Sequence, residues 1–265
     1  MTTATLPPPD EAGALFTALL TMTPPQLAKA LSAEPDKVLR LVRAAAECGL
    51  AEGQLRYGRM WLDGLGCARD PIAAVAWFAR AAEQGHAGAR NMLGRCCENG
   101  WGTATDFAAA AHWYRLAAEA GDAWGQYNLG HLYLNGYGVT RDAAKALAWY
   151  RAASHQGHAR ARNLVGRCCE QGWGTQKDLD EAARWYRLSA EGGYFRGQYN
   201  HASLLMAQGK RDEAETWFQR AIAQAPEPSQ TLMIADCAEA WGLQYGGLRY
   251  TSAGHDADTG ALQAG

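Results

Sequence analysis

The sequence predicts an all-α protein built as a solenoid, in which helix–turn–helix units stack one on the next. Tryptophan, a pair of turn glycines, an aspartate and a closing glycine each recur every 36 residues. A fixed period of about 20 to 50 residues is the signature of a solenoid or array. The series are Trp77, Trp113, Trp149 and Trp185; Gly64/Gly66, Gly100/Gly102, Gly136/Gly138 and Gly172/Gly174; Asp70, Asp106, Asp142 and Asp178; and Gly85, Gly121, Gly157 and Gly193.

The overall composition excludes some classes of partner. The 265 residues are 48% hydrophobic, and 25 basic against 27 acidic residues give a net charge of -2, which favours neither nucleic acid nor an anionic membrane. No apolar run approaches the roughly 20 residues that span a bilayer. Met1 to Asp10 lacks the basic segment that begins a signal peptide. We therefore expect a cytoplasmic protein with no membrane insertion and no nucleic-acid partner.

Residues 122–157 illustrate how each unit is expected to fold. Tyr127, Leu129 and Tyr133 fall at helical intervals and mark one face of a first helix. The following turn carries Gly136 and Gly138, which adopt positive φ at little cost. A second helix is expected over about residues 143–155, with an aspartate before it as N-cap and a glycine after it as the C′ residue.

The units follow one another along the chain with atypical ends. Residues 34–49 match the second helix of the next block at the same offset, which indicates a degenerate first unit. Trp185 and Trp217 lie only 32 residues apart, so the last repeat has a shorter turn. The expected order is a disordered N-terminus (1–9), a helical cap or degenerate repeat (10–49), four repeats (50–85, 86–121, 122–157 and 158–193), a shorter repeat (194–226), a closing helix (227–245) and a disordered tail (246–265).

A single hairpin cannot bury its apolar face, whereas a stack of hairpins can. The recurring tryptophan and the aromatic residue that follows it are therefore expected to fill the space between successive units. We interpret this aromatic stripe as core, in preference to a platform on which a ligand stacks. On that view, truncation of one of these tryptophans to alanine removes about 3–5 kcal/mol of stability.

The motifs of the third block resemble the Sel-1-like repeat, a relative of the tetratricopeptide repeat. They include Leu129-Gly130, Asn135-Gly136, Trp149-Tyr150 and Ala152-Ala153. The resemblance covers residues 50–193 strongly and residues 194–226 in the shorter tetratricopeptide style. It implies a right-handed α-solenoid that serves as a non-catalytic adaptor or scaffold, typically in bacterial signalling, secretion or envelope regulation. No catalytic residue and no cofactor come with the motif.

Two of the blocks are closer to each other than to their neighbours. Residues 86–121 and 158–193 share 24 identities over 36 positions, including the strings Arg-Cys-Cys-Glu and Gly-Trp-Gly-Thr. The blocks between and before them lack those strings. A unit of 72 residues was therefore duplicated, and we expect equivalent surfaces two repeats apart.

By the tetratricopeptide resemblance, the first helices line the concave side of the array, with two positions of each facing the groove. We expect these positions to bind an acidic or extended segment of a partner protein, because forked Arg bonds suit carboxylates. The alternative reading is that the arginines form i,i+3 ion pairs with Glu98 and Glu170. The candidate residues are Arg59, Asn91, Arg95, Tyr127, His131, Asn163 and Arg167.

The seven cysteines and the histidines give weaker signals. The doublets Cys96-Cys97 and Cys168-Cys169 lie two repeats apart, too far to share an ion or a disulfide, and we interpret them as buried filler in a reducing compartment. No histidine pair has metal-ligand spacing, and His155 and His158 are expected to be solvated. No metal is predicted.

Two other functions remain open at this point. Cysteine-rich Sel-1-like relatives are associated with β-lactam binding or hydrolysis, but the sequence has neither Ser-x-x-Lys nor Gly-x-Ser-x-Gly, which display an activated serine. A solenoid with imperfect caps can also associate end to end as a structural protein. A monomeric scaffold is the favoured interpretation.

Overall fold

The computed structural model describes the chain except for residues 1–21, 24–25, 27–28, 31–32, 34 and 243–265. The two predicted disordered ends and part of the predicted N-terminal cap lie outside the described residues. Within the described part, twelve helices have defined bounds and no strand occurs. They are α3 (Pro35–Glu47), α4 (Ala51–Asp63), α5 (Pro71–Glu83), α6 (Ala87–Asn99), α7 (Phe107–Glu119), α8 (Ala123–Asn135), α9 (Ala143–His155), α10 (Ala159–Gln171), α11 (Leu179–Glu191), α12 (Phe195–Ala207), α13 (Arg211–Gln224) and α14 (Glu227–Trp241).

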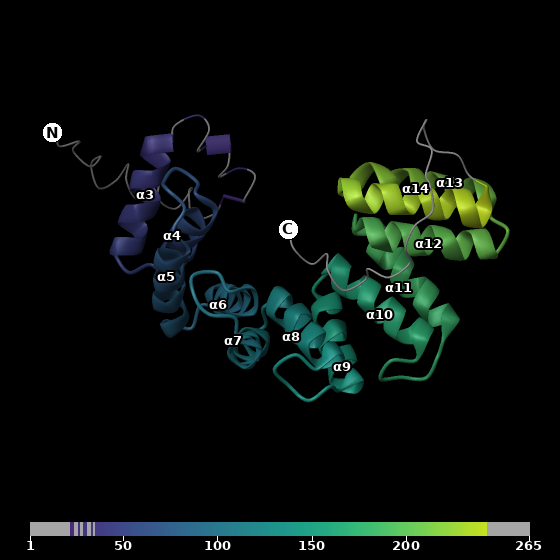
Figure 1. The fold of residues 1–265 in the computed structure, drawn as a ribbon, viewed down its shortest axis with the longest axis horizontal. Helices are drawn as coiled ribbons and strands as arrows, with labels where there is room; N and C mark the ends of the chain where they lie inside the picture. The colour runs from purple at the N-terminus through teal and green to yellow at the C-terminus, as the bar shows by residue number, and fades with distance from the viewer. Residues whose placement is uncertain (1–21, 24–25, 27–28, 31–32, 34, 243–265) are drawn as a thin grey trace.

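Successive helices pack on one another from α3 to α14, so the prediction of an all-α solenoid is confirmed. The pairs α4/α5, α6/α7, α8/α9, α10/α11 and α12/α13 are the repeats, and each even-numbered helix from α4 to α12 is a first helix. Figure 1 shows the stack as an arc, with α6 and α8 on its inner side and α7 and α9 on its outer side. The first helices α6 and α8 also contact each other, as do α10 and α12.

The helix ends follow local sequence signals. Asp70, Asp106, Asp142 and Asp178 precede the second helices, and each side chain accepts hydrogen bonds from backbone N–H groups of the first turn, as predicted. The first helices α4, α6, α8 and α10 end at a glycine with a φ of 71° to 76°. Three first helices have caps that the sequence reasoning missed, namely His86, Asp122 and His158.

Within each hairpin, a glycine lets the two helices approach. Gly94 on α6 lies against the ring of Tyr114 on α7, and a Cβ at Gly94 would fall 2.5 Å from that ring. Gly58, Gly130 and Gly166 meet the aromatic residue of their own second helices in the same way. The glycine at this position, which follows a leucine in repeats 2 and 3, therefore makes room for an aromatic side chain.

The second glycine of each long turn connects one repeat to the previous one. Gly102 lies against the backbone of Pro71 at the start of α5, and Gly138 lies against the backbone of Phe107 at the start of α7. Gly174 makes the equivalent contact with Ala143. These glycines also have φ values of 65° to 71°. The turns therefore take part in stacking the repeats.

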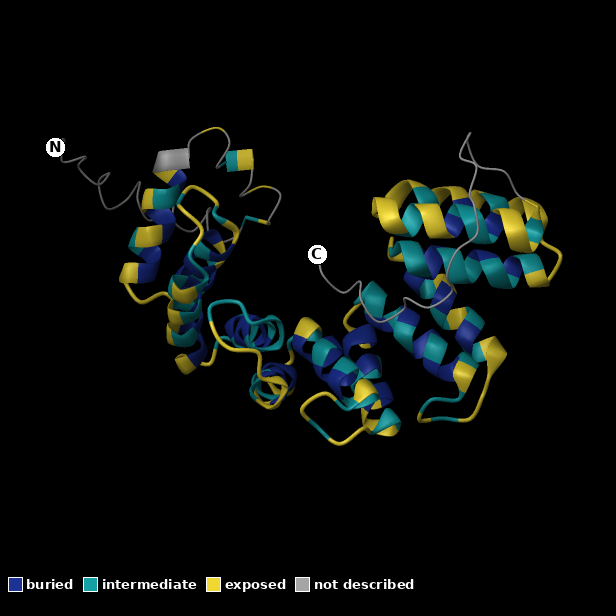
Figure 2. Cartoon of the chain, viewed as in Figure 1, coloured by how far each residue is buried: buried dark blue, intermediate teal, exposed yellow. Residues whose placement is uncertain are grey.

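The aromatic core is centred on the residue after each tryptophan. Phe78, Tyr114, Tyr150, Tyr186 and Phe218 are fully buried. The tryptophans of the 36-residue series are only half-buried and pack at the edges of the clusters, so the expectation that they are core residues on a par with their neighbours was wrong. Figure 2 shows the buried positions concentrated where helices face one another.

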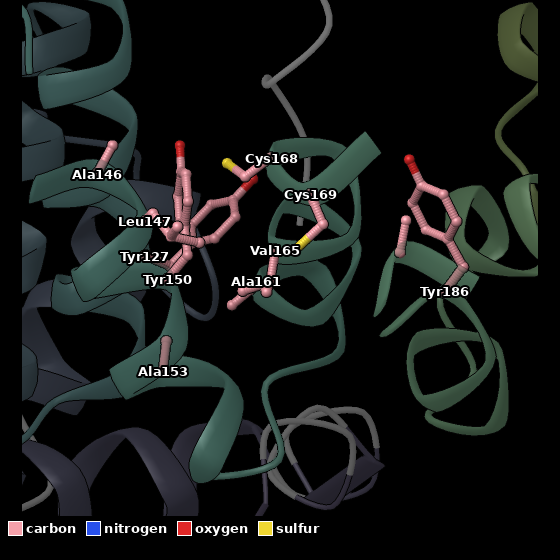
Figure 3. Packing of buried hydrophobic residues seen from close by; sticks show 11 residues of the cluster. Tyr127, Ala146, Leu147, Tyr150, Ala153, Ala161, Val165, Cys168, Cys169 and Tyr186 are labelled. Carbon is pink, nitrogen blue, oxygen red and sulfur yellow. The ribbon is translucent and has the colours of Figure 1, made fainter. Parts of the chain in front are cut away.

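One buried hydroxyl group is left without a protein partner. Tyr114 donates to Glu98 at 2.5 Å, and Tyr186 donates to Glu170 at 2.9 Å. Repeat 3 has Tyr150 at the equivalent place, but the residue in the carboxylate position is Leu134, and the hydroxyl of Tyr150 has no hydrogen bond. Figure 3 shows Tyr150 beside Tyr127 and Cys168, with Tyr186 on the other side of α10.

Replacement of Gly138 by alanine is expected to cost more stability than the same change at Gly121. Both residues have positive φ, 65° and 87°, so each alanine costs about 1–2 kcal/mol in backbone strain. Only Gly138 also meets a neighbouring backbone, which adds roughly 1–3 kcal/mol of overpacking, whereas a Cβ at Gly121 has nothing within 4 Å. Urea denaturation followed by circular dichroism measures the difference, and equal losses would contradict the role of Gly138 in stacking.

The Tyr150→Phe substitution is expected to stabilise the protein by about 1–2 kcal/mol, because it removes a buried hydroxyl that lacks a partner. Tyr114→Phe is the matched control, and it is expected to destabilise the protein because it leaves Glu98 without its donor. Urea denaturation of both variants at neutral pH gives the comparison. A loss of stability in both would show that the Tyr150 hydroxyl is satisfied.

Candidate interaction surface

The structure separates the seven predicted site residues into two groups. Asn91, Tyr127 and Asn163 are buried, with 6%, 5% and 3% of their surface exposed. Asn128 donates to the Oδ1 atom of Asn91 at 2.9 Å, and Asn200 donates to that of Asn163 at 2.8 Å. Both hydrogen bonds join neighbouring first helices. These three side chains therefore offer little surface to a partner and serve the stack instead.

The other four predicted residues are accessible. They occupy the same position of successive first helices, 36 residues apart in the sequence. Arg59 is exposed, and Arg95, His131 and Arg167 are half-buried. Three of them lie near an aromatic side chain of the following turn. The distances are 5.1 Å from the Arg95 guanidinium carbon to the Trp101 ring centroid, 6.2 Å between the His131 and Tyr137 ring centroids, and 5.4 Å from the Arg167 guanidinium carbon to the Trp173 ring centroid.

We call Arg95/Trp101, His131/Tyr137 and Arg167/Trp173 the cation–aromatic ladder. Contact with an aromatic ring attracts a cation electrostatically and restricts its side chain. The planar guanidinium of Arg95 still has N–H groups along its edge for other partners. Burial lowers the pKa of His131, so the middle rung is neutral near pH 7 and donates only as a neutral ring. The ladder thus has two permanent cations, Arg95 and Arg167.

Arg59 extends the positive charge toward the N-terminal end of the array. Its side chain is exposed, yet surrounding protein lowers its pKa; Glu52 raises the pKa in part, and Arg95 lowers it. A group that is accessible and still partly desolvated is typical of a concave surface.

The carboxylates expected to pair with the arginines have other partners. Glu98 and Glu170 accept hydrogen bonds from the buried tyrosines Tyr114 and Tyr186. Burial raises the pKa of Glu98 most, while Tyr114 and Arg95 lower it. Arg95 is close enough to act on Glu98 through space, but the two form no ion pair within 4.0 Å among the described residues. The ion-pair alternative therefore does not account for Arg95.

A second cluster lies on the same face of the first helices as the cation–aromatic ladder, two helical turns closer to their N-terminal ends. Arg160 lies 5.3 Å from the Trp124 ring and 5.7 Å from the Tyr194 ring. Trp124 is 41% exposed, and it is the one tryptophan of the described residues that is exposed. The sequence reasoning missed this cluster, although Arg160 and Trp124 precede Arg167 and His131 by seven residues and so share their helix faces.

His158 packs against the aromatic rings of this cluster. The sequence analysis expected a solvated side chain, but His158 is half-buried. Its Nδ1 atom accepts the N–H of Ala161 at 3.1 Å, which caps α10. Its ring lies 4.4 Å from that of Trp124 and stacks on Tyr127 at 5.0 Å. Burial, and then Arg160, lower the pKa of His158 to about 4. The imidazole is therefore neutral at physiological pH.

The cysteines have the properties of buried filler. All seven are free, and Cys96, Cys168, Cys169 and Cys237 are buried. Burial raises the pKa of Cys96 and Cys168 to about 12, so these thiols stay protonated and are poor nucleophiles. Across the described residues, no three His, Cys, Asp or Glu side chains are grouped so that they could hold a metal ion. Nor does any helix in that part of the chain combine the length and apolar character needed to cross a membrane.

Comparison with known families agrees with this architecture. The Sel1 repeat model matches residues 51–86, 87–122, 125–158, 159–194 and 196–226. The chain therefore belongs to the Sel1 repeat family, a group of helical-repeat proteins that are generally non-catalytic and typically act as scaffolds for protein interactions. A search of curated proteins gave no match.

Solved structures of similar fold come from several bacteria. A Sel1 repeat protein from Oxalobacter formigenes is 26% identical with a TM-score of 0.67, over 82% of this chain and 94% of that one. A protective antigen of uropathogenic Escherichia coli with an SLR fold is 24% identical with a TM-score of 0.66, over 89% of this chain and 51% of that one. An immunity protein from Pseudomonas aeruginosa is 20% identical with a TM-score of 0.51, over 87% of this chain and 82% of that one. The last two likenesses concern the fold alone.

Stability is expected to fall between pH 6.5 and about 4 through His158. The folded pKa lies below the ordinary value of 6.5, so the unfolded chain binds a proton that the fold excludes. The free energy of unfolding therefore decreases as the pH falls through this window, by about 1–2 kcal/mol for a half-buried ring. His158→Asn keeps a capping side chain but cannot titrate. Urea denaturation at several pH values should show a smaller decline in this variant than in wild type, while a His155→Gln control should follow wild type.

Proposed function

We propose that the protein is a non-catalytic scaffold whose concave face binds an acidic, extended segment of a partner protein. The observation that carries the proposal is the cation–aromatic ladder, together with the desolvated Arg59 beside it. Arginine that is held in place loses less side-chain entropy when it binds, so its bonds to a carboxylate contribute more net affinity. Repeats 2 and 4 each offer such an arginine, with the neutral His131 of repeat 3 between them.

The spacing of the ladder indicates the form of the bound segment. Neighbouring packed helices lie roughly 8–10 Å apart, which sets the step from one rung to the next. A polyproline II chain rises about 3.1 Å per residue with three residues per turn, so every third side chain lies on one side at intervals of about 9 Å. A segment with a carboxylate at every third residue would match the ladder, and a preformed conformation would reduce the entropy lost on binding.

The rest of the proposed role follows from the family and from the cysteines. We infer a monomer that works in a reducing compartment such as the bacterial cytoplasm, in signalling, secretion or envelope regulation. The seven free cysteines support a reducing compartment, because disulfides form and persist mainly in oxidising ones. The arginines of the concave face favour an acidic partner. The net charge of the whole chain is -2, which does not favour nucleic acid, so an acidic protein segment is the better match.

A fluorescein-labelled peptide Glu-Pro-Pro-Glu-Pro-Pro-Glu tests the proposal by fluorescence anisotropy. The Arg95→Ala/Arg167→Ala double variant is expected to bind it at least tenfold more weakly than wild type, because it loses two charge-assisted contacts. Binding should also weaken as the salt concentration rises.

Two controls decide whether the ladder is responsible. The double variant Arg184→Ala/Arg187→Ala removes two exposed arginines of α11 and should bind like wild type. A peptide with the same composition but the order Glu-Glu-Glu-Pro-Pro-Pro-Pro should bind less tightly than the spaced peptide. Unchanged affinity in the Arg95/Arg167 variant would remove the assignment of the ladder as the binding site.

A further inference from the structure

The cluster around Arg160 has the parts of a binding site that is separate from the ladder. It lies at the N-terminal ends of α8, α10 and α12, where equivalent positions 36 residues apart hold Trp124, Arg160 and Arg196. Arg160 comes from the middle helix, and the two rings near it come from the repeats on either side. Three consecutive repeats therefore contribute side chains to the cluster around Arg160.

The charge of Arg160 is not neutralised by the described residues. Arg160 forms no hydrogen bond or ion pair with any of them, and its contacts are the rings of Trp124 and Tyr194. Asp122, the carboxylate at the same end of α8, accepts the N–H of Gly125 at 2.7 Å and so serves its own helix. A guanidinium that stacks on rings keeps its edge N–H groups available for a planar, forked acceptor.

The surroundings add positive potential and an apolar face. Burial raises the pKa of Tyr127 to about 12, while Arg160 and Arg196 lower it, so both guanidinium groups act on that residue through space. His158 beneath them is neutral and adds no charge of its own. The exposed ring of Trp124 lies beside Arg160 and offers apolar surface to a ligand.

We propose that Trp124 and Arg160 form a second docking site on the concave face, which binds a peptide carboxylate that stands next to a large apolar side chain. Arg160 would take the carboxylate by forked hydrogen bonds, and the apolar side chain would lie on Trp124. The proposal deepens the proposed function, since the same partner segment could continue from the ladder to this site. About 10 Å separates residues seven apart on one helix, such as Arg160 and Arg167.

Fluorescence anisotropy with three labelled peptides tests this site. The probe is fluorescein-Gly-Gly-Glu-Phe-Glu-Gly, and its controls replace the phenylalanine by alanine or both glutamates by glutamine. Wild type is expected to bind the probe at least tenfold more tightly than either control peptide. Arg160→Gln and Trp124→Ala should each weaken binding of the probe at least fivefold, while Arg184→Gln on α11 should change it less than twofold.

The outcomes separate this site from the ladder. The Arg95→Ala/Arg167→Ala variant should still bind the Glu-Phe-Glu probe within threefold of wild type, and Arg160→Gln should still bind the proline-spaced peptide. Circular dichroism and thermal unfolding show whether each variant keeps its fold. The absence of saturable binding of the probe up to 1 mM, equal binding of the three peptides, or an unchanged affinity in folded Arg160→Gln would overturn the proposal. Failure of the proline-spaced peptide alone would remove the ladder and leave this site standing.

Discussion

The contact between a glycine of each first helix and an aromatic ring of its second helix is the constraint on which the rest of the molecule depends. Gly58, Gly94, Gly130 and Gly166 each lie directly against the ring of Phe78, Tyr114, Tyr150 or Tyr186. Because the ring occupies the space of a missing Cβ, the two helices pack closely and the aromatic residue becomes fully buried. The hairpin that results presents its other faces to the repeats before and after it, so the stack and the groove follow from this contact.

The sequence allowed accurate prediction wherever the determining interactions are local. The aspartate caps of the second helices and the left-handed glycines depend on backbone groups within a few residues, and they were predicted correctly. His86 and His158 were missed as caps because an imidazole caps only in the tautomer with an unprotonated Nδ1, and the sequence does not show which tautomer is present. The recurring tryptophans were predicted to be core residues but are half-buried, because a period in the sequence does not distinguish a buried ring from one at the edge of a cluster.

The candidate site was harder to predict because it depends on neighbouring repeats. Asn91 and Asn163 were expected in the groove, but the next repeat supplies Asn128 and Asn200, which bind and cover them. Trp124 and Arg160 come from the first helices of two different repeats, α8 and α10, so neither stands out in a single repeat. The rungs Arg95 and Arg167 were predicted, whereas their contacts with Trp101 and Trp173 require the fold of the turn that follows.

The duplication explains why the chemistry concentrates in the middle of the array. Repeats 2 and 4 share the Tyr–Glu pair, the Asn–Asn bond and the Arg–Trp rung, so they contribute equivalent parts of the surface. Repeat 3 lies between them and lacks the Tyr–Glu pair and the Arg–Trp rung, although its Asn128 donates the hydrogen bond to Asn91. It supplies Tyr127, His131 and the exposed Trp124, and it lacks a carboxylate for Tyr150. A partner that contacted only repeats 2 and 4 would find the same groups twice, whereas one that crosses repeat 3 meets a different surface. On the proposed function, repeat 3 would therefore determine selectivity for one partner.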